Sequence, residues 1–130
     1  MKDIMDKLEY KGKEYTLIFN FNVLEDIQEQ YGTLDQALGE AYGKDTGEPS
    51  IKALSFIVMS MLNEGIDIDN ETKEIPEKLL TQKQTNRILS NFVQANGVNK
   101  VVNMVDTLMA KSLQGGEDSK NESSTKMTKK

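Results

Sequence analysis

The segment that decides the fold is residues 50–62, which read SIKALSFIVMSML. Ser50 is suited to cap a helix, and apolar side chains follow it at the spacing of one helical face. Phe56 and Met59 add apolar surface outside that stripe. A helix that is apolar around so much of its circumference is usually covered on two or more sides, so we expect it at the centre of a bundle. The stripe consists of Ile51, Leu54, Ile57, Val58, Met61 and Leu62.

Two shorter helices are predicted before this segment. The first is expected to begin at Asn22, with Glu25 as its capping partner, and to end at Gly32. The second is expected to begin at Thr33 and to end at Gly43, where a turn-forming stretch leads into the central helix.

The N-terminal residues show the alternation of a β-hairpin. Apolar and polar side chains alternate on both sides of the turn Lys11-Gly12-Lys13, which predicts two antiparallel strands within residues 1–20. The apolar and aromatic positions of this pattern are Leu8, Tyr10, Tyr15, Leu17 and Phe19.

Two further helices are predicted after the central one. Residues 64–76 are polar and acidic, with Gly65 near the start and Pro76 at the end, so we expect a surface loop there. Thr81 and Gln84 form a capping-box pattern that opens a helix ending near Gly97. The last helix is expected to end near residue 113, and its apolar positions are Val98, Val101, Val102, Val105, Leu108 and Met109.

These elements predict a mainly α protein, in which an N-terminal β-hairpin precedes a compact bundle of about five helices. Residues 1–113 form one domain in this prediction, a common size for a single core. From Gln114 onward the chain is rich in Gly, Ser, Thr, Asn, Lys and acids, with Met127 as the one side chain suited to a core. We therefore expect residues 114–130 to be a disordered polar tail.

Composition argues against several classes of function. The 16 Lys and Arg are outnumbered by 21 Asp and Glu, giving a net charge of −5, which argues against nucleic acid as a partner. The chain contains no Cys and no His, which removes thiol and imidazole catalysis and the usual ligands of zinc and haem. No segment approaches the roughly 18 to 20 apolar residues that cross a bilayer, so no membrane association is expected.

Two segments resemble ligand-binding loops only in part. Residues 67–71 read DIDNE, but counting from Asp67 as for a calcium loop places Thr72 at the required glycine and Lys78 at the final acid. Residues 39–44 read GEAYGK, but the glycines are one residue too close for a phosphate-binding loop, and Asp45 replaces the Ser or Thr that would hold magnesium. We expect neither a metal nor a cofactor.

No pair of carboxylates stands out as catalytic. Glu25, Asp26 and Glu29 lie on the first predicted helix, where an ordinary solvated face explains them, because a catalytic carboxylate needs burial or a partner that shifts its pKa. The sequence therefore predicts no catalytic residue and a protein that is not an enzyme.

The apolar stripe of the last helix offers a candidate partner-binding surface, with Val101, Val105, Leu108 and Met109 as its central residues. Such a stripe either closes the bundle or contacts a partner, and through self-association it could do both. Both alternatives are open from the sequence.

A resemblance to a known family rests on residues 15–22, which read YTLIFNFN, followed by Leu24, Glu25 and the turn at residues 31–34. The segment resembles the start of the tail assembly chaperones of long-tailed (siphovirus-type) bacteriophages. Those proteins similarly place a strand or hairpin before an F-N/D-F-N entry to the first helix, and a glycine before a short second helix. The order and length of the helix at residues 51–62 are also similar, so the likeness covers roughly residues 15–63.

The resemblance implies a phage or prophage assembly factor in the host cytoplasm that is left out of the virion. Such a chaperone binds and solubilises the tape measure protein while tail tube subunits polymerise around it. This chain would be the short form, and a longer form made by ribosomal frameshifting would recruit the tail tube protein. Because a coat along a long partner needs lateral contacts, we also expect weak homo-oligomers. The alternative is a small structural or head-tail joining protein of the virion.

Overall fold

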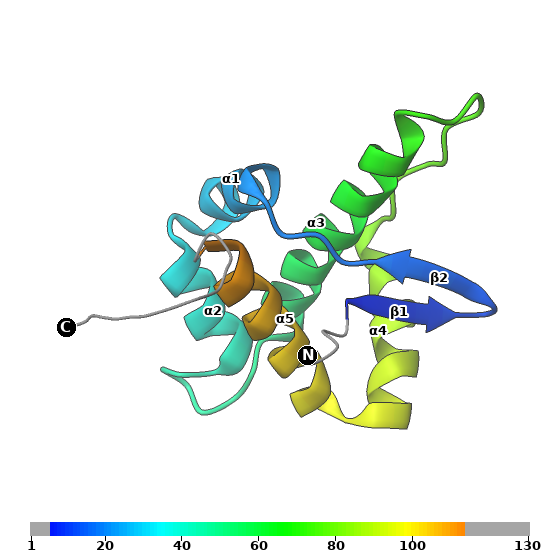
Figure 1. Cartoon of the computed structure of the whole chain (residues 1–130). Coiled ribbons are helices and arrows are strands. Elements are labelled where there is room, and N and C mark those ends of the chain that lie inside the picture. The colour runs from blue at the N-terminus through cyan, green and yellow to red at the C-terminus, as the bar shows by residue number, and fades with distance from the viewer. Residues whose placement is uncertain (1–5, 114–130) are drawn as a thin grey trace, which may run out of the picture.

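The computed structural model describes residues 6–113 and is mainly helical, with a two-stranded hairpin at the start of the described chain (Figure 1). The predicted fold class is therefore confirmed, while the predicted tail at residues 114–130 lies outside the described residues. The elements are β1 (Lys7–Tyr10), β2 (Lys13–Thr16), α1 (Phe21–Tyr31), α2 (Leu34–Tyr42), α3 (Ile51–Asn70), α4 (Gln82–Asn96) and α5 (Val98–Leu113).

The apolar segment at residues 51–62 lies in the central helix, α3, as predicted. Helix α3 packs against α1 and α2 on one side and against α4 and β2 on the other, and α5 crosses the front of the bundle in the view of Figure 1. Ile57 and Met61 retain no exposed surface. One hydrophobic core draws on the hairpin and on every helix from α1 to α5.

Local capping signals set most of the helix boundaries. Ser50 accepts a hydrogen bond from the backbone N–H of Ala53 and begins α3. Thr81 and Gln84 form a complete capping box at the start of α4. Gly43 ends α2 with a positive φ of 74°, a conformation in which glycine is favoured. These predicted boundaries are confirmed.

The predicted cap of the first helix is wrong by two residues. The N-cap is Asn20, whose side chain accepts from the backbone N–H groups of Asn22 at 3.0 Å and Val23 at 3.2 Å. Asn22 lies inside the first turn, and its side-chain amide donates to Glu64 of α3 at 3.0 Å. Asn20 therefore caps α1, and both asparagines tie the start of α1 to α3, because the side-chain amide of Asn20 also donates to Glu64 at 2.7 Å.

The predicted loop at residues 64–76 is wrong in its first half, because α3 continues to Asn70. Gly65 lies within this helix, where the main chain at the end of β2 passes close to it. A Cβ atom at Gly65 would lie 2.5 Å from the carbonyl oxygen of Thr16. The N–H of Ile18 reaches the carbonyl oxygen of Met61 at 3.2 Å, and Ile66 is buried. Gly65 therefore permits a close tertiary approach and does not end the helix.

The segment that follows α3 is held along the helix by two asparagine side chains. Asn70 donates to the carbonyl of Glu77 and accepts from its N–H, both at 2.9 Å. Asn63 makes the same pair of bonds with Leu80, at 3.1 and 2.7 Å. Each pair satisfies backbone groups that a sheet or helix would otherwise satisfy, so this polar segment has a defined path back to α4.

No helix within residues 6–113 is both long and apolar enough to cross a membrane.

A hydrogen bond between Tyr42 and Asp106 joins α2 to α5. The phenol donates to a carboxylate oxygen of Asp106 at 2.7 Å. Burial, together with this bond, raises the pKa of Tyr42 well above its usual range. An unfolded tyrosine ionises near pH 10, so the stabilisation is fully present below that pH and is lost as the pH rises toward the folded pKa.

We expect Tyr42→Phe to lower the free energy of unfolding by about 1 kcal/mol at neutral pH, the usual net value of one hydrogen bond. The difference from the parent protein should shrink above about pH 10, because phenylalanine cannot ionise. Urea unfolding followed by circular dichroism at several pH values measures both effects. Tyr10→Phe is the control, and a difference that does not change with pH would contradict the assignment.

Candidate partner-binding site

The four residues predicted to bind a partner are buried in the folded domain. Val101, Val105, Leu108 and Met109 of α5 are between 1% and 8% exposed and belong to the hydrophobic core. Of the two alternatives for this stripe, the structure shows the one in which it closes the bundle. An accessible partner surface must therefore be sought elsewhere.

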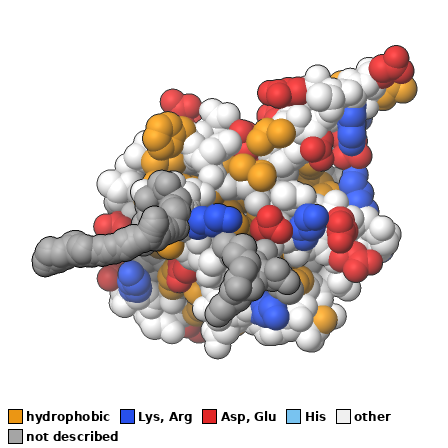
Figure 2. Space-filling view, in the orientation of Figure 1, with side chains coloured by type: hydrophobic (Ala, Val, Ile, Leu, Met, Phe, Trp, Pro, Cys, Tyr) orange, Lys and Arg blue, Asp and Glu red, His pale blue; other side chains and the backbone are white. Residues whose placement is uncertain are grey.

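The face of the molecule in Figure 2 carries its apolar side chains in separate groups among charged ones. No single broad apolar patch is visible on that face. Grooves between elements offer candidate sites, and two of them differ clearly in chemistry.

The first, which we call the apolar groove, lies where the start of α3, the middle of α4 and the start of α5 meet. It encloses about 400 Å³, and none of its lining side chains is charged. Ile51 is 61% exposed and Val98 is 37% exposed, while Leu54 and Leu89 are buried beneath them. The lining residues are Pro49, Ile51, Leu54, Asn86, Leu89, Ser90, Val93 and Val98.

The helix ends explain why this groove is open. Ile51 and Val98 are each the first residue of a helix, so they continue an apolar stripe beyond the point where neighbouring helices cover it. Gly97 turns the chain between α4 and α5 at a φ of 88°, and its N–H donates to the carbonyl of Val93 at 2.7 Å. This turn places the start of α5 beside Val93, with which it shares the groove.

The apolar groove is suited to remove apolar side chains of a partner from water. Burial stabilises by about 0.8 kcal/mol per methylene group, and no charged group of the groove would have to lose its hydration. One face of an amphipathic helix presents side chains of this kind at three- and four-residue spacing. The groove thus has the chemistry of a helix-binding site.

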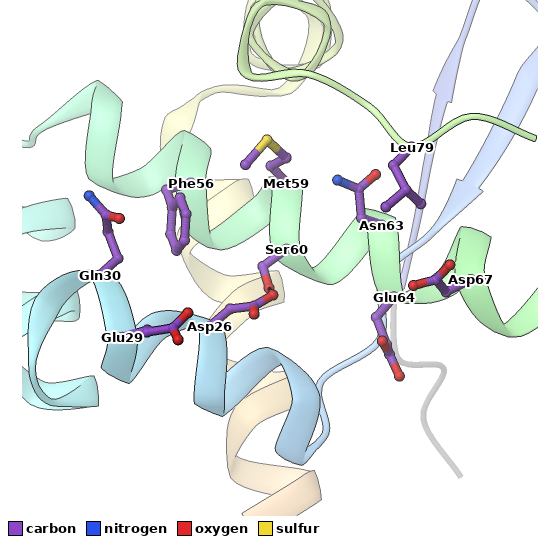
Figure 3. Close-up of a pocket in the computed structure, with 10 residues that line it drawn as sticks. All are labelled: Asp26, Glu29, Gln30, Phe56, Met59, Ser60, Asn63, Glu64, Asp67 and Leu79. Carbon is purple, nitrogen blue, oxygen red and sulfur yellow. Dashed lines mark hydrogen bonds between the residues drawn. The ribbon is translucent and has the colours of Figure 1, made fainter.

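The second groove, which we call the acidic groove, lies between α1 and α3 and encloses about 370 Å³ (Figure 3). Its lining includes four carboxylates and no Lys or Arg. Figure 3 shows Asp26 of α1 turned toward Ser60 of α3, whose hydroxyl donates to it at 2.8 Å. The lining residues are Asp26, Glu29, Gln30, Phe56, Met59, Ser60, Asn63, Glu64, Asp67 and Leu79.

The carboxylates of the acidic groove come from two distant parts of the sequence and are brought together by the packing of α1 against α3. Asp26 and Glu29 come from the solvated face of the first helix, and Glu64 and Asp67 come from the part of α3 that the sequence suggested was a loop. Glu64 accepts from the side chain of Asn20 at 2.7 Å as well as from Asn22. The sequence revealed the carboxylates but not that they face one groove.

The two partial loop motifs lie on helices. Asp67 and Asp69 belong to α3, and within residues 6–113 no group of three or more acidic side chains is placed to hold a metal ion. Gly39 lies inside α2 and Gly43 ends it, so this glycine pair is the end of a helix and not a turn after a strand.

Comparisons with protein-family models, with curated proteins and with solved structures found no match to this chain.

Proposed function

We propose that this protein is a tail assembly chaperone of a long-tailed bacteriophage. In this proposal it binds and solubilises the tape measure protein in the host cytoplasm and helps the tail tube to polymerise around it. The observation that supports the proposal best is the apolar groove, because it offers uncharged, partly exposed apolar side chains between three helices. The resemblance of residues 15–63 to such chaperones points the same way.

A tape measure protein that is not yet inside its tube needs its apolar surface covered. A long helical tape measure protein exposes apolar stripes before its tube has formed, and exposed stripes cause aggregation. Each chaperone copy would cover a few anchor side chains, with Ile51 and Val98 at the rim and Leu54 and Leu89 beneath them. Individual contacts would be weak, and many copies on one partner would hold it through their number and through weak contacts between copies.

As proposed, the protein is not an enzyme and uses no cofactor. The tail tube protein would be recruited by a longer, frameshifted form of the same chain.

The test is co-expression of the tagged chain with the tape measure protein of the same phage. We expect the parent chain to keep the tape measure protein soluble and to retain it on an affinity resin. Ile51→Ser combined with Val98→Ser should lower that recovery by about ten-fold, because two apolar side chains would no longer be buried. Both positions are exposed, so the fold should be preserved, and circular dichroism can confirm this.

The matched control is Ile75→Ser combined with Leu113→Ser, which removes two exposed apolar side chains outside the groove. Equal recovery with both double variants would contradict binding in the apolar groove. Failure of the parent chain to solubilise the tape measure protein would contradict the function. Detection of the chain in purified particles would point instead to a structural or head-tail joining protein.

A further inference from the structure

The acidic groove combines an apolar floor with negatively charged walls. Phe56, Met59 and Leu79 supply apolar surface, and Leu79 is 47% exposed. The two ion pairs among the described residues join Lys13 and Lys73 to Glu77, which does not line the groove. The groove carboxylates thus have no cationic partner within residues 6–113. A ligand that fits would carry positive charges around a flexible apolar side chain.

The chain itself contains such a segment. Residues 126–130, outside the described range, read KMTKK, which places three lysines around Met127 with no acid among them. The preceding residues 114–125 are polar and carry acids of their own. Residues 114–125 hold one lysine, Lys120, against three acids, so the net positive charge and the methionine both lie in residues 126–130.

The described chain ends near the start of α1, the helix that flanks this groove. Leu113, at the end of α5, lines a hollow together with Phe21 and Asn22 at the start of α1. The side-chain amide of Asn22 donates to Glu64, one of the carboxylates of the acidic groove. Asn22 therefore lines a hollow with Leu113 and also contacts a carboxylate of the acidic groove.

Chain length permits the segment to reach the groove. Residues 114–125 supply up to about 40 Å of extended chain. Helix α1, which flanks the groove, has 11 residues and is about 16 Å long. The linker can therefore span the whole groove without being fully extended.

We propose that residues 126–130 bind in the acidic groove of their own chain. The lysines lie against Glu29, Glu64 and Asp67, and Met127 covers the apolar floor. Exposed ion pairs are individually weak, but the short tether gives the segment a local concentration in the millimolar range. A basic segment of another protein must displace this tail to enter the groove. This inference is independent of the proposed function, which rests on the other groove.

The test uses the absence of cysteine from the chain, so that Ser124→Cys provides a single site for a nitroxide spin label. The label on the full-length, isotope-labelled protein should broaden the backbone amide signals of Glu29 and Asp67. Changing all three lysines of residues 126–130 to glutamine should reduce this broadening by about two-fold or more, as should salt at about 0.3 M. Met127→Ser should also reduce it without any change in charge.

Matched variants distinguish binding at the groove carboxylates from a general attraction between the lysines and an acidic protein. Glu29→Gln with Asp67→Asn should reduce the broadening of the remaining groove signals as strongly as the lysine changes. Asp45→Asn with Glu48→Gln removes the same charge from the exposed turn between α2 and α3 and should leave the broadening unchanged.

Three results would overturn the proposal. One is equal broadening from the parent tail and from the tail whose last three lysines are glutamine, and another is an equal effect of the two pairs of carboxylate changes. The third comes from mixing isotope-labelled protein that lacks the nitroxide with unlabelled protein that carries it. Broadening of the same strength in that mixture would assign the contact to a second copy instead of the same chain.

Discussion

Gly65→Ala is expected to lower the free energy of unfolding by about 2 kcal/mol, although alanine favours helices more than glycine does. The added Cβ would lie 2.5 Å from the Thr16 carbonyl oxygen and 3.7 Å from a side-chain carbon of Ile18. The first of these neighbours is main chain, so it can move only if the end of β2 and the residues after it move away from α3. That movement would break the bond from the Ile18 N–H to the Met61 carbonyl oxygen.

The matched control is Gly39→Ala in α2. Nothing lies within 4 Å of a Cβ atom built there, so we expect a gain of about 0.5 to 1 kcal/mol from helix propensity alone. Urea unfolding followed by circular dichroism measures both variants. Two changes of the same sign would show that the segment after β2 does not press on α3 at Gly65.

The role of Gly65 also shows where sequence reasoning reaches its limit. Ser50 and Thr81 could be recognised as caps because their partners lie three residues away in the same segment. Gly65 stands among polar and acidic residues, and such a glycine normally indicates the end of a helix. Its contact with Thr16 joins distant parts of the chain, so no local pattern could reveal that α3 continues to Asn70.

The first helix shows the same limit on a smaller scale. Asn20 and Asn22 have the same side chain and lie only two residues apart, so local propensity scarcely separates them as caps. In the folded chain Asn20 bonds both to the first turn of α1 and to Glu64, while Asn22 lies inside that turn and bonds to Glu64 alone, a tertiary contact that no local pattern contains. Helical periodicity in residues 23–31 was independent of that choice and was predicted correctly.

The candidate sites were less accessible to sequence reasoning than the fold. Periodicity identifies the residues of an apolar stripe, but it does not say which end of the stripe neighbouring helices leave uncovered. On α5 the buried part contains Val101 and Val105, and the exposed part is Val98 at its start. The acidic groove likewise requires α1 to pack beside α3, which brings Asp26 and Glu29 opposite Asp67.

Val105→Asp is expected to destabilise the protein severely. Val105 is 1% exposed and lies in the hydrophobic core, so the new carboxylate would be buried without a partner. The expected cost is about 4 kcal/mol or more, a large part of the 5 to 15 kcal/mol that stabilises a typical domain. Taking up a proton would remove the charge but would leave a polar group without a hydrogen bond. Thermal unfolding and size-exclusion chromatography measure the loss.

The same variant separates the two alternatives for the stripe on α5. If the stripe were a partner surface, Val105→Asp would leave a folded protein that no longer bound its partner. Asn103→Asp provides the control, because it adds a charge to the exposed face of the same helix and should change stability by less than about 0.5 kcal/mol. Equal stability of both variants would show that this face of α5 does not belong to the core. A loss of stability in Val105→Asp alone makes the stripe structural, which is consistent with the proposal that an apolar partner contacts Ile51 and Val98 instead.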